Sequence, residues 1–425
     1  MANAISRRNF LAGTSVLFVA GAATACGSSD DGKDSAARGT KITLSQWYHA
    51  YGEAGTQQAV QRYAAAYTKA NPDVAIKISW IAGDYETRLN SALLSSSAPD
   101  LFEIGDFRAS NVKSGLLAPL DDIIGPVRSD YARSALDTAT VDGKVYGVKM
   151  MDDVMMLYYR KSVLDKAGIV PPRTFTELLA AAKSLTSGKQ KGLFIGSDGV
   201  GDVPYLLLWS SGGDLVDPSG RTVTFNTPEA AAAIGALKDL NSSGTLLQGF
   251  TTDWFDPGAL VQGAAAMHWC GLWAMPDIKK KLGDDFGVVP WPAFGGSGSP
   301  AVRVGGWYHL VNGKGPHVDA AKKYANWLWI QQADLQKDWC VSYGFHVPSR
   351  KSVAAQTTPF SSGPAQETVA LSQQYGHSFP PVWNKATTTA FIQSCAKIAK
   401  GKADVAAELA DAAKACQAEL DKQNA

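Results

Sequence analysis

The sequence predicts an α/β fold in which mainly parallel sheets are covered by helices. Short apolar strands alternate with helices after residue 40, and residues 154–159 form an unbroken apolar run typical of a strand buried on both faces. Such alternation places successive strands side by side in one sheet. The chain has 425 residues, of which 45% are hydrophobic, so it is long enough for two domains with a sizeable core each.

Charge and aromatic content narrow the class of ligand. Lys and Arg total 40 against 39 Asp and Glu, so no charge excess would attract nucleic acid or an anionic membrane. The chain also has 12 Trp and 14 Tyr, several in glycine-rich or polar company. Aromatic faces stack on sugar rings and on cations, although Trp also fills protein cores.

The first 25 residues have the pattern of an export signal. Arg7 and Arg8 precede an apolar run at residues 10–20, which is too short to span a bilayer. Residues 6–11, SRRNFL, resemble the twin-arginine export motif. The general secretory route, with two arginines by chance, stays open as the alternative.

Cys26 ends a segment, Ala-Thr-Ala-Cys, that resembles a bacterial lipobox, with Ala23 where Leu is usual. Gly, Ser and Asp dominate residues 27–39, the composition of a flexible tether. We therefore expect a signal peptide over residues 1–25 and a lipidated Cys26 with its tether over residues 26–39. The body would be exported and lipid-anchored on the outer face of the cytoplasmic membrane.

The first part of the body predicts three strands and two helices. The strands are residues 41–47, 74–80 and 101–104, and the helices are residues 59–70 and 85–95. Ligands bind beyond the carboxyl ends of strands in such sheets, which selects the loops at residues 47–53 and 105–108. The candidate contacts in these loops are Trp47, His49, Glu53, Asp106 and Arg108.

Residues 141–185 carry dense turn and capping signals. Asp142-Gly143 predicts a two-residue turn, and Ser162 is the expected N-cap of a helix at residues 163–167. Thr174 is the expected N-cap of the next helix, with Glu177 completing a capping box.

The order of motifs in this stretch, DGxxYGV, YYxK, LxKAGI and PPxTFxELL, resembles the extracellular solute-binding proteins of ABC importers, in the maltose-binding-protein-like branch. The resemblance implies two lobes with a ligand cleft between them, a carbohydrate ligand, a membrane permease as partner, no cofactor and no catalysis. It makes residues 146–153 the first crossing between lobes. It also matches Asp153, six residues before Tyr159, to an acidic ligand contact.

The same resemblance divides the chain into two lobes of interleaved sequence. It assigns residues 40–148 and 296–340 to the N-terminal lobe, and residues 149–295 and 341–425 to the C-terminal lobe. The second crossing is expected near residues 290–303 and the third near residues 340–348, where GFHVPSR resembles a turn of the family that contains Gly, Pro and Arg.

Aromatic residues of the second half are further candidates. Trp209 precedes a GG pair and is either a helix-packing residue or a cleft wall, and Trp383 follows two prolines that could bring it to the cleft. The resemblance matches Gly306 and Trp307 to a segment that approaches ligand, where glycine lets backbone amides come close.

Residues 258–275, GALVQGAAAMHWCGLWAM, resemble the family pattern GxAAM followed by a strand and GxW, whose Trp stacks on ligand. Trp273 takes that position. If the strand extends to residue 273, one face of it carries Trp269, Gly271 and Trp273. The glycine then leaves a slot between the two indole rings for a flat ring of the ligand. Trp269 as a core residue is the alternative.

Four cysteines of the body, Cys270, Cys340, Cys395 and Cys416, allow three complete pairings. Cys395 and Cys416 fit poorly across a level helical hairpin, whereas Cys270 and Cys340 both lie near crossings and fit better. No Cys/His spacing typical of a metal site occurs, so we expect no metal.

No GxSxG, HExxH, P-loop or GxGxxG pattern occurs, and adjacent Asp152 and Asp153 point oppositely on an extended chain. We therefore expect a monomeric, non-catalytic receptor for a short oligosaccharide. An exported glycoside-active enzyme, a surface adhesin or sensor, and a receptor for a polyol or cationic ligand stay as alternatives. Nothing in the sequence selects the sugar.

Overall fold

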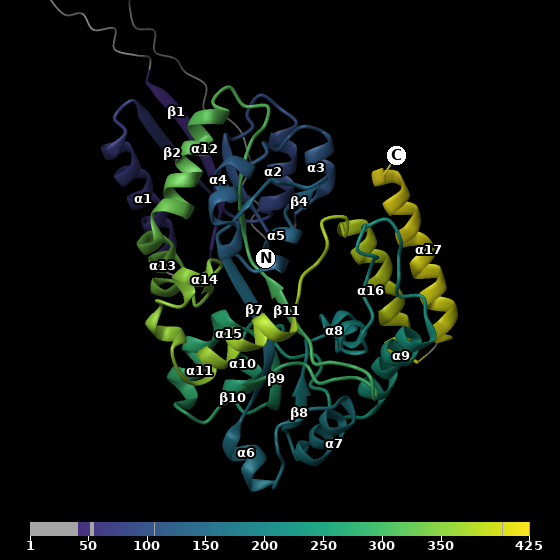
Figure 1. The fold of residues 1–425 in the computed structure, drawn as a ribbon. Coiled ribbons are helices and arrows are strands. Elements are labelled where there is room, and N and C mark those ends of the chain that lie inside the picture. Colours follow the sequence, from purple (N-terminus) through teal and green to yellow (C-terminus); the bar gives the residue numbers. More distant parts are fainter. Residues whose placement is uncertain (1–40, 52–54, 106, 402, 425) are drawn as a thin grey trace, which may run out of the picture. The chain divides into compact units, whose positions relative to one another are not determined.

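Two mixed β-sheets form the framework of the computed structural model, which describes residues 41–51, 55–105, 107–401 and 403–424 (Figure 1). The first sheet has the strand order β2-β1-β3-β12-β6, and the second has the order β14-β11-β7-β9-β8, with β10 and β13 also paired to β7. The first sheet comprises β1 Ile42–His49, β2 Val74–Ile81, β3 Leu101–Ile104, β6 Val148–Lys149 and β12 Tyr308–Val311. The second comprises β7 Met151–Tyr159, β8 Lys191–Phe194, β9 Ala265–Gly271, β10 Gly287–Val289, β11 Val302–Gly305, β13 Val347–Pro348 and β14 Gly376–His377. The predicted α/β fold with two sheet-containing lobes is confirmed.

Strand direction differs between the two sheets. In the first, β1 is parallel to both neighbours, β2 and β3, as the alternation of strands and helices predicts. In the second, β7 is antiparallel to its neighbours β9 and β11. The chain enters β7 directly from β6, with only Met150 between them, rather than through a helical crossover. The expected parallel arrangement therefore holds around β1 and fails around β7.

Helices cover both sheets. They are α1 Thr56–Ala70, α2 Tyr85–Leu93, α3 Ala109–Lys113, α4 Asp121–Ile124, α5 Arg133–Asp137, α6 Lys161–Lys166, α7 Phe175–Leu185, α8 Val203–Ser210, α9 Pro228–Ser242, α10 Gly258–Val261, α11 Met275–Leu282, α12 Val318–Asn326, α13 Ala333–Ser342, α14 Lys351–Ala354, α15 Gly363–Tyr375, α16 Lys385–Ala399 and α17 Val405–Asn424. A π-helix, Trp327–Gln331, continues α12, and a two-stranded ribbon pairs β4 Thr140–Val141 with β5 Lys144–Val145.

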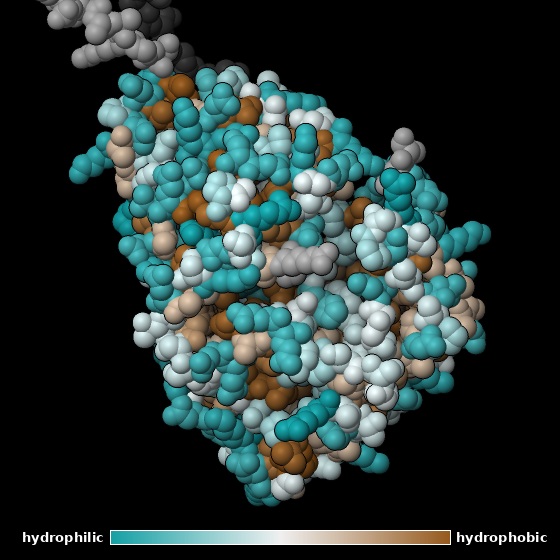
Figure 2. Space-filling model, viewed as in Figure 1, coloured by the Kyte–Doolittle hydropathy of each residue, from teal (hydrophilic) through white to brown (hydrophobic). Residues whose placement is uncertain are grey.

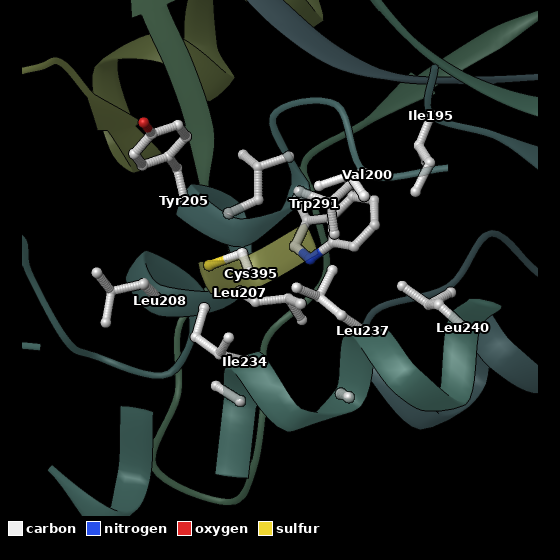
Figure 3. Packing of buried hydrophobic residues seen from close by; sticks show 14 of the residues in the cluster. Ile195, Val200, Tyr205, Leu207, Leu208, Ile234, Leu237, Leu240, Trp291 and Cys395 are labelled. Carbon is white, nitrogen blue, oxygen red and sulfur yellow. The ribbon is translucent and has the colours of Figure 1, made fainter. Parts of the chain in front are cut away.

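Each sheet has a hydrophobic core. In the first lobe, α1 and α13 pack aromatic side chains such as Tyr63 and Trp339 against the strands. In the second lobe, α8, α9, α16 and α17 bury a larger core (Figure 1). Figure 3 shows Ile234, Leu237 and Leu240 projecting from one face of α9 toward the rest of this cluster. Burial of apolar area at about 25 cal/mol per Å² makes these two cores the main source of stability.

Local signals in the sequence set several element boundaries. Asp142 and Gly143 both have positive φ, 49° and 77°, as a two-residue hairpin turn between β4 and β5 requires. Thr174 and Glu177 form the predicted capping box of α7. The predicted N-cap at Ser162 is wrong: α6 begins one residue earlier, and the Ser162 amide and hydroxyl instead donate to Asp285, at 2.6 and 2.8 Å.

The chain passes between the sheets at three places. The first is Met150, between β6 and β7, and the third is residues 343–346, between α13 and β13. The second lies at Gly306 and Trp307, because β11 still pairs with β7 and only β12 joins the first sheet. The expected position near residues 290–303 is therefore too early. Gly306 has φ 120°, and a Cβ there would lie 2.1 Å from the carbonyl oxygen of Met151, so this passage requires glycine.

All four body cysteines are free and buried. Cys270 lies in the core of the second lobe and Cys340 in the core of the first, so the favoured pairing of these two is wrong. Burial raises the pKa of each thiol, to about 12 for Cys416. Buried thiols with raised pKa values are poor nucleophiles.

The face of the molecule in Figure 2 is mainly hydrophilic, with scattered hydrophobic patches. Among the described residues, the large hydrophobic side chains that are exposed are Leu94, Val170 and Phe255. Within the same residues, no helix has the length and apolar character needed to cross a membrane.

Candidate ligand cleft

Two adjoining cavities, of about 400 and about 40 Å³, lie between the lobes. Both are lined by Arg303 on β11 and by Phe379 and Trp383 from the segment between β14 and α16. The first lobe contributes Glu86 and Arg108 to the larger cavity and Gly105 and Lys149 to the smaller one. The second lobe adds Asp202, Tyr205, Asn384, Lys385 and Thr388 to the larger cavity. A molecule in this space would contact both lobes at once.

Two ion pairs line the larger cavity, one in each lobe. In the first lobe, Arg108 donates to Glu86 at 2.8 Å. In the second lobe, Arg303 is paired with Asp202. Each carboxylate fixes the orientation of its guanidinium group and offsets the positive charge. The wall of the larger cavity therefore presents oriented N–H donors without a large net charge.

Aromatic rings hold Arg303 and form the rest of the wall. The guanidinium carbon of Arg303 lies 4.6 Å from the centre of the Phe379 ring. Phe379 in turn meets the edge of Tyr205 at 4.7 Å. The Tyr205 hydroxyl lies beside Trp383 and Thr388, yet neither it nor the Trp383 indole nitrogen makes a hydrogen bond of normal geometry among the described residues. These two buried polar groups line the cavity and suit a polar ligand.

Lys149 forms the floor of the smaller cavity and is 1% exposed. Its ammonium lies 3.0 Å from Asp152 and 5.1 Å from the centre of the Tyr308 ring. Burial alone would lower the pKa of Lys149, but the Tyr308 oxygen and Asp152 outweigh burial and raise it. Lys149 is therefore a fixed cation at the first passage between the lobes.

Three of the predicted site residues line the cavities: Arg108, Gly306 and Trp383. Two others, His49 and Trp307, stack on each other at the carboxyl end of β1, with ring centres 3.9 Å apart and planes 17° apart. Beneath them the fully buried Glu103 accepts hydrogen bonds from the His49 amide at 2.8 Å and the Tyr51 hydroxyl at 2.7 Å.

Trp47 and Asp153 lie outside both cavities. Trp47 packs, half-buried, against the core around α2, and its carbonyl oxygen accepts from the Tyr85 hydroxyl at 3.4 Å. Asp153 is 9% exposed and is bonded to His346, so this contact joins the first passage between the lobes to the third. Glu53, Asp106, Cys26 and the predicted signal and tether are outside the described residues.

Trp209 and Trp269 are core residues. Trp209 is 2% exposed, stacks on His377 with ring centres 5.0 Å apart and donates to Asp214. Trp269 is fully buried and meets Trp291 edge to face. In both cases the structure agrees with the packing interpretation, because neither ring reaches a cavity.

The predicted slot between Trp269 and Trp273 does not exist. β9 ends at Gly271, and Leu272–Ala274 form a 3₁₀-helix, so the two indoles do not share a strand face. The ring of Trp273 itself lies over Gly271, where a Cβ would come within 2.0 Å of it. Trp273 is half-buried, meets Trp254 at 6.0 Å and donates to the Phe255 carbonyl at 2.9 Å. Glycine is needed there for the indole of this chain rather than for a ligand ring.

Residues 53–328 match the model of the family "Bacterial extracellular solute-binding protein". This chain belongs to that family. The match supports the resemblance found in the sequence, and a family of extracellular proteins implies that this solute-binding protein is exported.

Individual relatives are distant. A probable ABC transporter-binding protein of Deinococcus radiodurans is 29% identical over 48% of this chain and 52% of its own length. The arabinooligosaccharide-binding protein of Bacillus subtilis is 23% identical over 65% of this chain and 67% of its own length. The crystallised GacH receptor of Streptomyces glaucescens, solved unliganded and with acarbose, is 25% identical with a TM-score of 0.74 over 90% of this chain and 99% of that one. The alignment thus spans about half of the first relative's length and about two thirds of the second's.

Several cavity residues of this solute-binding protein were missed by the sequence analysis, notably Arg303, Asp202, Tyr205 and Phe379. Asp202 and Tyr205 follow β8 at the start of α8, so the rule that ligands bind beyond strand ends could have selected them. Arg303 and Phe379 gave no such signal, because their pairing joins segments 76 residues apart and depends on the tertiary fold. Among the described residues, no group of acidic, His or Cys side chains could hold a metal ion.

Proposed function

We propose that this protein is the substrate-binding receptor of an ABC importer and that it captures a short oligosaccharide between its lobes. The observation that carries the proposal is the pair of adjoining cavities lined from both lobes by aromatic rings and guanidinium groups held by carboxylates. The larger, of about 400 Å³, falls in the range of small-molecule sites, roughly 300–1,000 Å³.

The chemistry of this wall suits a sugar. The Phe379 ring offers a flat surface for the C–H face of a sugar ring, and Trp383 lines the same cavity while being 4% exposed. Arg108, Arg303 and Asn384 offer donors for hydroxyl oxygens, and the carboxylates of Glu86 and Asp202 offer acceptors. The names of relatives that bind arabinooligosaccharide and acarbose support the same class of ligand.

Binding would work by lobe closure. A ligand that touches both lobes favours the closed arrangement by the difference in its affinity for the closed and open states. The three passages between the sheets would act as the hinge, with the first sheet and its helices as one lobe and the second sheet and its helices as the other. The closed receptor, a monomer, would present its ligand to the permease.

The ion pairs favour a receptor over a glycoside-active enzyme. Glycoside hydrolysis needs two carboxyl groups across the scissile bond, one of them with a raised pKa as general acid. Glu86 and Asp202, the two carboxylates that line the larger cavity, are each bonded to an arginine of their own lobe rather than directed at a scissile bond.

Titration calorimetry tests the ligand class. The exported body should bind arabinotriose or maltotriose, with sorbitol and choline as probes of the polyol and cation alternatives. Trp383→Ala should weaken sugar binding about tenfold, because a stacking platform contributes about 0.5–1.5 kcal/mol beyond area burial. Trp327→Ala, which removes an indole packed on Tyr67 and Tyr324 outside the cavities, is the matched control. Heat from choline or sorbitol alone would overturn the sugar assignment.

Trp273 stays a proposed stacking residue on the basis of the GxW match. Its half-buried indole lies next to Trp254 and the exposed Phe255, which together form an aromatic patch in the second lobe. Trp273→Ala should then weaken sugar binding about tenfold while the protein stays folded. Unchanged binding with a lower unfolding midpoint would assign Trp273 to packing alone.

We also propose that Cys26 is lipidated after twin-arginine export. Cys26→Ala in the native host should move the protein from the membrane fraction to the medium. A variant as firmly membrane-bound as the wild type would exclude the anchor. Arg7→Lys with Arg8→Lys should block export if the twin-arginine route is used, whereas the general secretory route tolerates both changes.

A further inference from the structure

Residues 378–383, here called the strap, connect β14 to α16 and contact both lobes. On the side of the first lobe, the Thr138 hydroxyl donates to the Phe379 carbonyl at 3.3 Å. The Ala109 amide, at the start of α3, donates to the Pro381 carbonyl at 3.1 Å. Val382 packs against the hydrophobic clusters of both lobes.

The strap is equally well fixed to the second lobe. The Ser378 hydroxyl donates to the Val304 carbonyl at 2.7 Å, directly after Arg303. The Gln423 side chain on α17 donates to the Val382 carbonyl at 3.1 Å, and the Gln423 carbonyl accepts from Lys113 of the first lobe. The end of the C-terminal helix therefore supports the strap from behind and also reaches the first lobe.

The side chains of the strap form part of the cavity wall. Phe379 holds the Arg303 guanidinium at 4.6 Å, and both residues line the two cavities together with Trp383. One residue, Phe379, thus bonds to the first lobe through its carbonyl oxygen and orients a cavity arginine of the second lobe through its ring. Movement of the first lobe away from the strap would break the bonds from Thr138 and Ala109 and leave the Phe379 backbone without support on that side.

We propose that the strap is a positioning element that couples the approach of the lobes to the orientation of Arg303 and Trp383 in the ligand cleft. Thr138 and Ala109 are its docking points on the first lobe. The role of the strap in ligand recognition rests on the proposed receptor function. The coupling between the strap and the approach of the lobes is a property of the ligand-free chain. The cleft wall is then completed only when the lobes approach, which makes closure part of ligand recognition.

Amide hydrogen exchange tests the coupling without any ligand. Thr138→Val removes the hydroxyl and keeps the side-chain shape, so the Ala109 amide and the strap amides should exchange about fivefold faster, as expected for loss of one hydrogen bond. Thr138→Ser keeps the hydroxyl and should restore wild-type exchange, a rescue that a general packing defect would not give. Thr140→Val is the matched control, because the Thr140 hydroxyl donates to Leu136 within the first lobe, at 2.7 Å.

The outcomes separate this proposal from the receptor function. Equal exchange of the Ala109 and strap amides in Thr138→Val and wild type would overturn the coupling, whatever the protein binds. Faster exchange in Thr138→Val and in Thr140→Val alike would also overturn it, because the effect would then be general loosening. If no sugar binds the wild type in calorimetry, the receptor proposal fails while the exchange result still decides the role of the strap.

Discussion

Arg303 makes two contacts that depend on the shape of its guanidinium group: it lies over the Phe379 ring at 4.6 Å and pairs with Asp202. Arg303→Lys keeps the charge and loses both geometries, so sugar affinity should fall about tenfold. Titration calorimetry with arabinotriose measures this. Arg62→Lys is the matched control, because Arg62 lies over Tyr343 at 5.8 Å and pairs with Asp338 far from the cavities. Equal affinities of Arg303→Lys and wild type would remove Arg303 from the site.

Two fully buried histidines predict how stability depends on pH. Burial lowers the pKa of His268 to about 4 and that of His309 to about 3, whereas a histidine in the unfolded chain titrates near 6.5. As pH falls below about 6.5, the unfolded state binds these protons first, so stability that is fully present above that pH is lost. Each histidine contributes a loss of about 1.4 kcal/mol per pH unit between roughly pH 6 and 4. Urea unfolding midpoints at pH 7, 6 and 5 should therefore decrease; a midpoint that stays constant or rises would contradict the neutral, buried state of these rings.

At the scale of single elements, the start of α7 is fixed by a reciprocal cap. The Thr174 hydroxyl accepts from the Glu177 amide at 3.2 Å, and the Glu177 carboxylate accepts from the Thr174 and Arg173 amides, at 3.2 and 2.7 Å. Thr174→Ala should lower the free energy of unfolding by about 1 kcal/mol, measured by urea denaturation. Thr389→Ala is the control, since it removes the same atoms from an exposed turn inside α16. A cost no larger than that of the control would show that the cap is dispensable.

Elements defined by local signals were predictable from the sequence, whereas those defined by contacts between distant segments were not. The turn at Asp142-Gly143 and the cap at Thr174 follow from side-chain size and hydrogen-bonding groups within four residues. The late position of the second passage, at Gly306, depends on β11 pairing with β7, about 150 residues earlier in the chain. Ser162 likewise lost its predicted cap because Asp285, from a distant segment, takes its donors.

The residues of the candidate site also fall into those with a local signal in the sequence and those that depend on contacts between distant segments. Arg108 was found from a strand end, Gly306 from a family motif and Trp383 from the two prolines before it, and all three line the cavities. Trp269 matched the same apolar stretch as Trp273, but its burial depends on Trp291, which the local pattern does not contain. Arg303 and Phe379 meet only in the folded chain, so no window of sequence could have paired them.

In the molecule as a whole, the segments that form the two lobes alternate along the sequence. The first sheet takes β1, β2, β3 and β6 from before β7 and β12 from after β11. The passages at Met150, Gly306 and residues 343–346 each adjoin β7 or a strand that pairs with it. A chain built this way cannot be cut into independent halves. To convert a mostly open population into a mostly closed one, the ligand must favour the closed state by about 5.5 kcal/mol.

Small-angle X-ray scattering of the exported body, with and without saturating arabinotriose, tests this central claim most directly. We expect the radius of gyration to decrease on ligand addition and the sugar to be recovered chemically intact, while sorbitol at the same concentration leaves the radius unchanged. If calorimetry shows saturation and the radius stays constant, closure is not the mechanism of binding. If the sugar is recovered hydrolysed, the protein is an enzyme rather than a receptor.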